Sequence, residues 1–170
     1  MWALVHQQLY NAGEAMLTGD KELAYKVISR ERRVNAFELK IDSDCEDIIA
    51  LYAPVAIDLR FVLAMYKINT NLERLGDFAE SIARFAGNLP EGEPIDPQLV
   101  KETRVEEMLS ELLSMISLTK EAFEKESSEI ASRIFLKDNL IDEINHNSTA
   151  IIAKYIEEHK GSALAGLYMA

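Results

Sequence analysis

Apolar residues recur at every third or fourth position along almost the whole chain, which is the spacing that lines one face of an α-helix. The first such stretch ends near Leu17, and its apolar face consists of Trp2, Val5, Leu9, Ala12 and Met16. Asp20 is a suitable N-cap for a second helix that runs to about Tyr52. After a turn at Pro54, the pattern predicts a third long helix over residues 56–88.

Residues 89–97 are polar and contain proline and glycine, so they predict a linker. Asp96-Pro97 is a favourable helix start, with Asp as the N-cap and Pro at the first helical position. A fourth helix is expected over about residues 97–125, and a fifth over about residues 128–159. Residues 163–170 predict the opening of a sixth helix that the sequence cuts short.

The two halves of the chain repeat at a constant offset of 107 residues. The positions that match are Ala24 with Ala131, Val27 with Ile134, Glu31 with Asp138, and Asn35 with Asp142. Both stretches open a long helix that follows a shorter one. The expected fold is therefore all-α, a tandem repeat of two three-helix bundles. The first unit covers residues 1–88, residues 89–97 link the two, and the second unit covers residues 98–170 with most of its third helix missing.

The composition suits a globular helical protein, with 48% hydrophobic and 28% charged residues among 170. A net charge of −11 argues against general binding to the phosphates of DNA or RNA. Cys45 is the only cysteine, which excludes a disulfide framework and a CxxC zinc motif. The longest apolar run, residues 48–57, is interrupted by Pro54 and is too short to cross a bilayer. Since no signal peptide opens the chain, we expect a cytoplasmic protein without membrane insertion.

Three pairs of carboxylates lie four residues apart within the helical patterns: Glu38 with Asp42, Glu73 with Asp77, and Asp138 with Asp142. Residues at this spacing project from one face of a helix, where like charges repel each other. Burial makes that repulsion far more costly unless a cation neutralises it. Facing pairs of this kind are typical of an oxygen-rich metal site.

The first two pairs belong to longer polar stripes that should face each other. The stripes are Glu31, Asn35, Glu38 and Asp42 on the second helix, and Asn69, Glu73, Asp77 and Glu80 on the third. Two helices joined by a tight turn near residue 55 pack antiparallel, so facing residue numbers sum to about 110. Glu31, Asn35, Glu38, Glu73 and Asp77 should then gather at one height, with Asp42 nearer the turn. Gly76 lets the two backbones, or a ligand, approach closely.

Ligands that are all oxygen suit Mg, Ca, Mn or Fe rather than a structural zinc ion. The alternative is that these acidic residues form an ordinary solvated face. Glu143 and His146 form a fragment of the ferritin-like di-iron pattern, but that fold needs two such motifs on separate helices and only one is present.

Two further features leave alternatives open. The apolar run over residues 48–57 is either an exposed docking surface or a segment buried in a dimer or core. Arg60, Lys67 and Arg74 form a row that is either solvated or an anion site. The chain contains no nucleophile–base arrangement and no phosphate-binding glycine loop, so we expect no enzyme activity.

The sequence resembles the PhoU family of phosphate-signalling regulators. The resemblance is found in residues 24–35, Asp58-Leu-Arg60, the LERLGD stretch over residues 72–77, and Asp138-Asn-Leu-Ile-Asp142. It implies two three-helix bundles whose acidic motifs pair to hold multinuclear metal clusters on the surface. The metal is commonly iron, with manganese, magnesium, calcium, nickel or zinc as alternatives.

The resemblance also implies ligands and partners. In the first repeat the metal ligands would be Glu31, Asn35, Glu38, Glu73 and Asp77, and in the second they would be Asp138 and Asp142. The implied role is repression of the phosphate-starvation response by a cytoplasmic homodimer, which links a phosphate ABC transporter to a membrane sensor histidine kinase.

The chain departs from the family pattern in two places. Position 35 is Asn where the second repeat has Asp142, and a second LERxGD motif is absent from the 170 residues, which leaves the second site half its ligands. We therefore expect a metal-binding regulator. The rival interpretations are a carboxylate-bridged metalloenzyme, such as a di-iron oxidase, and a helical adaptor that binds no metal.

Overall fold

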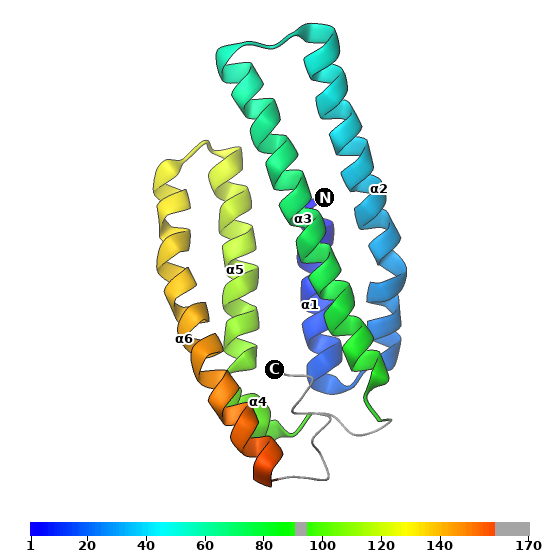
Figure 1. Ribbon diagram of the computed structural model, residues 1–170, viewed down its shortest axis with the longest axis vertical. Coiled ribbons are helices and arrows are strands. Elements are labelled where there is room, and N and C mark those ends of the chain that lie inside the picture. Colours follow the sequence, from blue (N-terminus) through cyan, green and yellow to red (C-terminus); the bar gives the residue numbers. More distant parts are fainter. Residues whose placement is uncertain (91–94, 159–170) are drawn as a thin grey trace.

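The computed structural model describes residues 1–90 and 95–158, and its regular elements there are all α-helices (Figure 1). They are α1 (Trp2–Thr18), α2 (Lys21–Tyr52), α3 (Ala56–Asn88), α4 (Pro97–Thr103), α5 (Val105–Glu124) and α6 (Ser128–Glu158). This confirms the predicted all-α class and the predicted bounds of the first three helices. The expected opening of a further helix over residues 163–170 lies outside the described residues. No described helix has both the length and the apolar character needed to cross a membrane.

The first bundle is built from α1, α2 and α3, and the turn between α2 and α3 projects beyond α1 (Figure 1). Asp20 caps α2 as expected, because its side chain accepts a hydrogen bond from the Leu23 amide at 2.9 Å. The α3 face that lies in the core is made largely of small residues, including the buried Ala79 and Ala83. Small side chains at these positions allow the three helices to pack closely.

The second bundle contains α4, α5 and α6, and it corrects one prediction. The single helix expected over residues 97–125 is broken at Arg104, whose φ of 54° is left-handed. Thr103 weakens the helix just before the break, since its hydroxyl donates to the carbonyl of Leu99 at 2.7 Å. The Arg104 guanidinium then holds the new direction by bonding Glu107 at 2.7 and 3.0 Å and Glu143 of α6 at 3.1 Å.

The helices α2 and α3 approach each other closely at Gly76. A Cβ atom at that position would lie 2.8 Å from Cγ1 of Val34, which is too close for two carbon atoms. Nearer the turn, the buried Asn69 amide donates to the Glu38 carbonyl at 2.9 Å and to the Asp42 carboxylate at 2.7 Å. These contacts confirm the register expected from residue numbers that sum to about 110.

We expect Gly76→Ala to destabilise the protein by about 1–3 kcal/mol, because the added methyl group has to displace the stiff, buried Val34 side chain. Gly87→Ala is the matched control on the same helix. Nothing lies within 4 Å of the Cβ position at Gly87, so this change should stabilise the helix by roughly 0.5–1 kcal/mol. Urea unfolding of both variants measures the difference.

If the Val34 contact is the cause, Val34→Ala should cost less in the Gly76→Ala background than in the wild type. Strictly additive costs for the two changes would show that the close approach at Gly76 does not set the distance between the helices.

Candidate metal centre

Five carboxylates line the contact between α2 and α3, and together they form what we call the acidic seam. Its members are Glu31 and Glu38 on α2, and Glu73, Asp77 and Glu80 on α3. On each helix the members are separated by three, four or seven residues, so they project toward the facing helix. The Gly76–Val34 contact lies in the middle of the seam and keeps the two rows of negative charge close together.

Glu31 is the most buried member, with 7% of its surface exposed. Its Oε2 accepts a hydrogen bond from the Asn35 amide at 2.8 Å, whereas its Oε1 has no hydrogen-bond partner in the described part of the structure. Burial raises the pKa of Glu31, and the charges of Glu80, Asp77 and Glu38 raise it further. A buried carboxylate oxygen that lacks a partner is unusual, because burying such a group costs free energy unless it is paired.

Glu73, on the facing helix, is half-buried and is subject to similar effects. Burial raises the pKa of Glu73, followed by the charges of Asp77 and Glu38 and by hydrogen bonding to the Asp77 carboxyl group. Two carboxyl groups hydrogen-bond each other only when one of them is protonated. The seam therefore favours uptake of a proton or of another cation.

The protein itself supplies little positive charge to the seam. Glu80, at one end, pairs with Arg84 at 2.6 Å. In the described residues, Glu31, Glu38, Glu73 and Asp77 form no ion pair with Lys, Arg or His. The repulsion between the carboxylates of the seam is consequently not offset by basic side chains, and a proton or a bound cation would reduce it.

The seam supplies the oxygen ligands that a cation needs, but in this structure they do not converge on one point. Across residues 1–90 and 95–158, no group of three or more His, Cys, Asp and Glu side chains converges in an arrangement that holds a metal ion. Glu31, whose Oε1 has no hydrogen-bond partner in the described residues, nevertheless lies among carboxylates, and oxygen donors suit hard cations. Glu38 and Glu73 are half-buried and Asp77 is exposed, so rotation about their side-chain bonds is the change that convergence on an ion requires.

The structure brings the predicted residues of the first repeat together. Asn35 acts through Glu31, because its amide donates to that carboxylate. Asp42 lies nearer the turn, as expected, and is held by Asn69. Glu80 and Asn69 belong to the α3 stripe but not to the expected ligand set. Their spacing from Glu73 and Asp77 was the signal that could have included both.

The second repeat differs. Its long helix α6 begins at Ser128, which is 107 residues after the start of α2 at Lys21, as the repeat predicts. Asp138 and Asp142 are both exposed on α6 and form no hydrogen bond or ion pair in the described part of the structure. Phe135, on the same face, is 73% exposed. The reason is that no described helix covers this face of α6 in the way that α3 covers Glu31.

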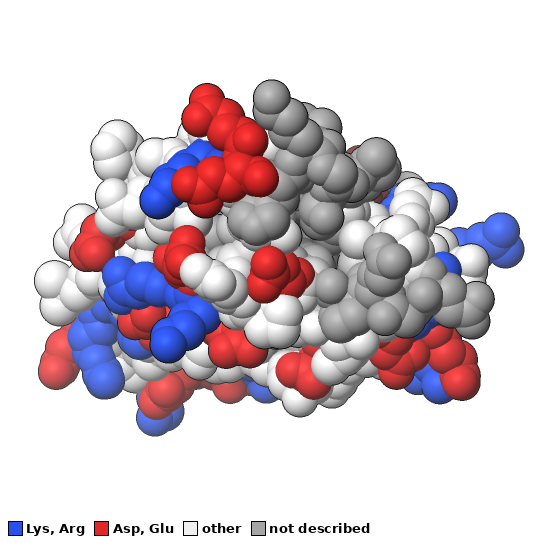
Figure 2. Space-filling view, turned by 90° about the horizontal axis from the view of Figure 1, so that it is seen from below, with Lys and Arg blue, Asp and Glu red and all other residues white. Residues whose placement is uncertain are grey.

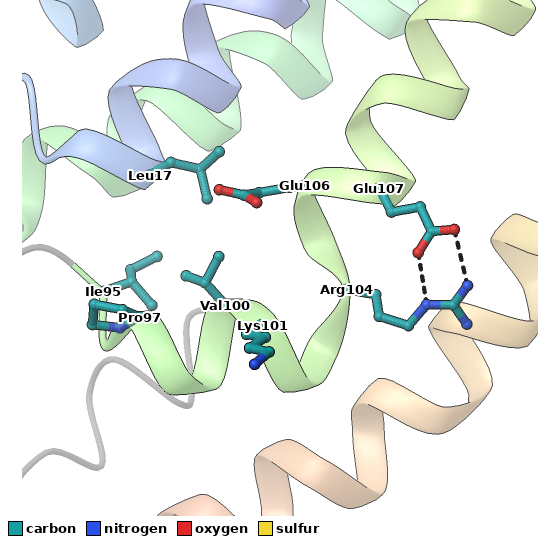
Figure 3. Close-up of a pocket in the computed structure, with 8 residues that line it drawn as sticks. All are labelled: Leu17, Ile95, Pro97, Val100, Lys101, Arg104, Glu106 and Glu107. Atoms are coloured by element: carbon teal, nitrogen blue, oxygen red, sulfur yellow. Dashed lines mark hydrogen bonds and ion pairs between the residues drawn. The ribbon is translucent and has the colours of Figure 1, made fainter.

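A separate cavity of about 510 Å³ lies where α1 ends near α4 and the start of α5 (Figure 3). Leu17, Ile95 and Val100 form an apolar wall, and the Arg104 guanidinium is bonded to Glu107 (Figure 3). None of the described residues that line the cavity belongs to the acidic seam, so the two are separate features.

The fold and the seam define a class of helical proteins built as a tandem repeat of three-helix units, the first of which places paired carboxylates on facing helices. The PhoU domain family model matches residues 1–86 and 105–168, and the chain belongs to the PhoU family. This confirms the family resemblance seen in the sequence.

Relatives and solved structures agree with the assignment. The chain is 34% identical over 160 residues to the phosphate-specific transport system accessory protein PhoU homolog of Aquifex aeolicus, covering 93% of this chain and 70% of that protein. It is 35% identical over 143 residues to PhoU of Escherichia coli, covering 84% and 58%. The crystal structure of PhoU from Pseudomonas aeruginosa superposes with a TM-score of 0.91 at 28% identity, over 99% of this chain and 79% of the other.

The seam predicts a specific pH dependence of stability. Because the pKa of Glu31 and of Glu73 is raised above the ordinary value of 4.5, the folded protein binds more protons than the unfolded chain between that value and the raised ones. The stability due to these groups is fully present below pH 4.5 and is lost as the pH rises through the raised values. Without added metal, Glu31→Gln and Glu73→Gln should therefore be more stable than the wild type at about pH 8 and lose that advantage near about pH 4.

Glu107→Gln is a control of opposite sign. Hydrogen bonding to Arg104 lowers the pKa of Glu107, so its Gln variant should be less stable than the wild type at neutral pH. Thermal unfolding across the pH range tests all three variants. A loss of stability at about pH 8 in both seam variants would contradict the charge repulsion assigned to the seam.

Proposed function

We propose that this chain regulates phosphate uptake and the phosphate-starvation response as a metal-binding protein that acts through contacts with other proteins. Support for the phosphate role comes from its relatives, which are named accessory proteins of phosphate-specific transport systems. A Streptococcus pneumoniae structure described as a phosphate transport system regulatory protein has a TM-score of 0.82 at 28% identity, over 99% of this chain and 77% of that chain. Accessory and regulatory names also favour a protein that is not an enzyme.

The observation that most supports metal binding is the buried Oε1 of Glu31, which has no hydrogen-bond partner in the described part of the structure and lies among four other carboxylates. A bound cation would supply the positive charge that these groups lack. Glu31, Glu38, Glu73 and Asp77 would hold it, and Asn35 would orient Glu31. Iron is the first candidate by family resemblance, and manganese, magnesium and calcium also suit oxygen ligands.

Asp138 and Asp142 are assigned to the second site of the tandem. Their exposure on α6 means that they need facing ligands from elsewhere to hold an ion firmly. In the proposed arrangement the first repeat binds metal independently of this pair.

The protein partners proposed are a phosphate ABC transporter and a sensor histidine kinase, contacted in the cytoplasm by a homodimer. The competing oxidase interpretation has weaker support, because Glu143 of the Glu143–His146 motif is hydrogen-bonded to Arg104. An adaptor without metal remains the alternative that a metal titration decides.

Metal addition should raise the melting temperature of the wild-type protein, because an ion that binds only the folded state adds stability, about 2.7 kcal/mol at a hundredfold excess over Kd. Glu73→Ala combined with Asp77→Ala should abolish this rise and lower the metal content measured by elemental analysis. Asp138→Ala combined with Asp142→Ala, a pair with the same spacing on an exposed helix, should retain most of both. Full metal content in the Glu73/Asp77 variant would refute the site.

Two outcomes favour the rivals. Stability that responds to neither metal nor chelator favours the adaptor, and oxygen consumption by the iron-loaded protein favours the oxidase. The phosphate role is tested in cells that lack the endogenous protein, with a phosphate-starvation reporter. The wild-type chain should restore repression in phosphate-rich medium, and failure to do so would contradict the proposed role.

A further inference from the structure

The turn between α2 and α3 exposes an unusually apolar surface. This surface, which we call the apolar tip, consists of Ile48, Ile49, Leu51, Tyr52, Val55 and Ile57. Leu51, Tyr52 and Val55 are 74%, 76% and 71% exposed, and the turn stands beyond the end of α1 (Figure 1). Burial of the tip in the core of this chain, which the sequence left open, is therefore wrong. Contiguous apolar patches on a protein surface commonly mark an interaction site.

The backbone presents these side chains in a fixed way. Ala53 and Ala56 have φ values of 43° and 49°, a left-handed conformation that L-residues seldom adopt, and Pro54 lies between them. The Ala53 amide donates to the Ile49 carbonyl at 3.2 Å and so closes the end of α2. A turn whose backbone is constrained at three of four consecutive residues loses little further freedom when it binds a partner.

Acidic residues surround the tip. Residues 44–60 contain Asp44, Glu46, Asp47 and Asp58 but only one basic residue, Arg60, for a net charge of −3. Lys40 bonds Asp44, while Glu46, Asp47 and Asp58 form no ion pair in the described part of the structure. The opposite end of the molecule, in contrast, shows acidic and basic side chains side by side (Figure 2).

The apolar surface extends from the tip toward the second bundle. Ile57 and Phe61 are one turn apart on α3, and Phe61 stacks on Phe123 of α5 with ring centroids 5.6 Å apart. Beside this pair lies a shallow hollow of about 350 Å³, lined by Phe61, Phe123, Ala122 and Ala131 among others. A partner seated on the tip therefore has a second contact that orients it relative to both bundles.

We propose that the apolar tip docks into a recess of a partner protein that is apolar inside and bordered by Lys and Arg. Charge decides between this occupant and its competitors. An anionic lipid surface would repel the acidic residues around the tip. Two tips that met across a dimer would bring like charges together. A recess with a basic border instead attracts the acidic residues around the tip, while the apolar side chains of the tip are removed from water inside it.

The docking assignment rests on the proposed function, which supplies the proteins to be tested. The phosphate ABC transporter and the cytoplasmic part of the sensor kinase, purified from the same organism, are each passed over the immobilised chain. Vesicles containing phosphatidylglycerol are tested in parallel, and sedimentation measures self-association.

The tip variant combines Leu51→Ser, Tyr52→Ser and Ile57→Ser. The control combines Tyr25→Ser, Leu39→Ser and Phe135→Ser, which remove equally exposed apolar side chains elsewhere. The tip variant should bind one of the two proteins at least about tenfold more weakly than the wild type, and the control within about twofold. Helical content and a cooperative thermal transition show that both variants are folded.

Charge reversal by Asp47→Lys and Asp58→Lys should also weaken binding and reduce its dependence on salt. Wild-type affinity in the tip variant would overturn the docking assignment and leave the proposed function intact. Binding to vesicles alone, or loss of self-association as the sole defect of the tip variant, would overturn it in favour of a membrane or of a second copy. A wild-type chain that binds neither protein would overturn the proposed function and the docking assignment together.

Discussion

The close approach of α2 and α3 at Gly76 and Val34 is the constraint on which the rest of the first repeat depends. Because position 76 has no Cβ atom, the helices pack near enough to bury Glu31 and to place it beside Glu73, Asp77 and Glu80. The pKa of Glu31 is consequently raised, first by burial and then by the charges of Glu80, Asp77 and Glu38. Packing thus creates an electrostatic cost that a proton or a bound cation would relieve, and the proposed affinity of the seam for cations depends on this same close contact.

Much of this arrangement could be predicted from the sequence, because helical periodicity and the turn at Pro54 determine which residues of a hairpin face each other. The facing of residues 38 and 73, and of residues 34 and 76, follows from that register. The orphaned Oε1 of Glu31 could not be predicted, since it depends on the side-chain conformation of Asn35. The break at Arg104 was also missed, because it arises from bonds to Glu107 and Glu143, and Glu143 lies 39 residues away.

The two repeats show why a sequence motif alone does not define a site. Glu31 and Asp138 occupy equivalent positions on α2 and α6, yet only Glu31 is buried. The difference comes from α3, which covers one helix and brings the second row of carboxylates. At the far end of the same hairpin, the turn between α2 and α3 exposes the apolar tip, so that one pair of helices carries both the proposed cation site and the proposed docking surface.

The proposed exchange of protons for a cation in the acidic seam is tested most directly by calorimetry. Metal is titrated into the metal-free protein in buffers of different ionisation enthalpy, which gives the number of protons released on binding. The raised pKa of Glu31 and of Glu73 predicts that protons are released below the raised values and that the number falls toward zero at higher pH. Binding without proton release at any pH, or no binding at all, would contradict the proposed exchange.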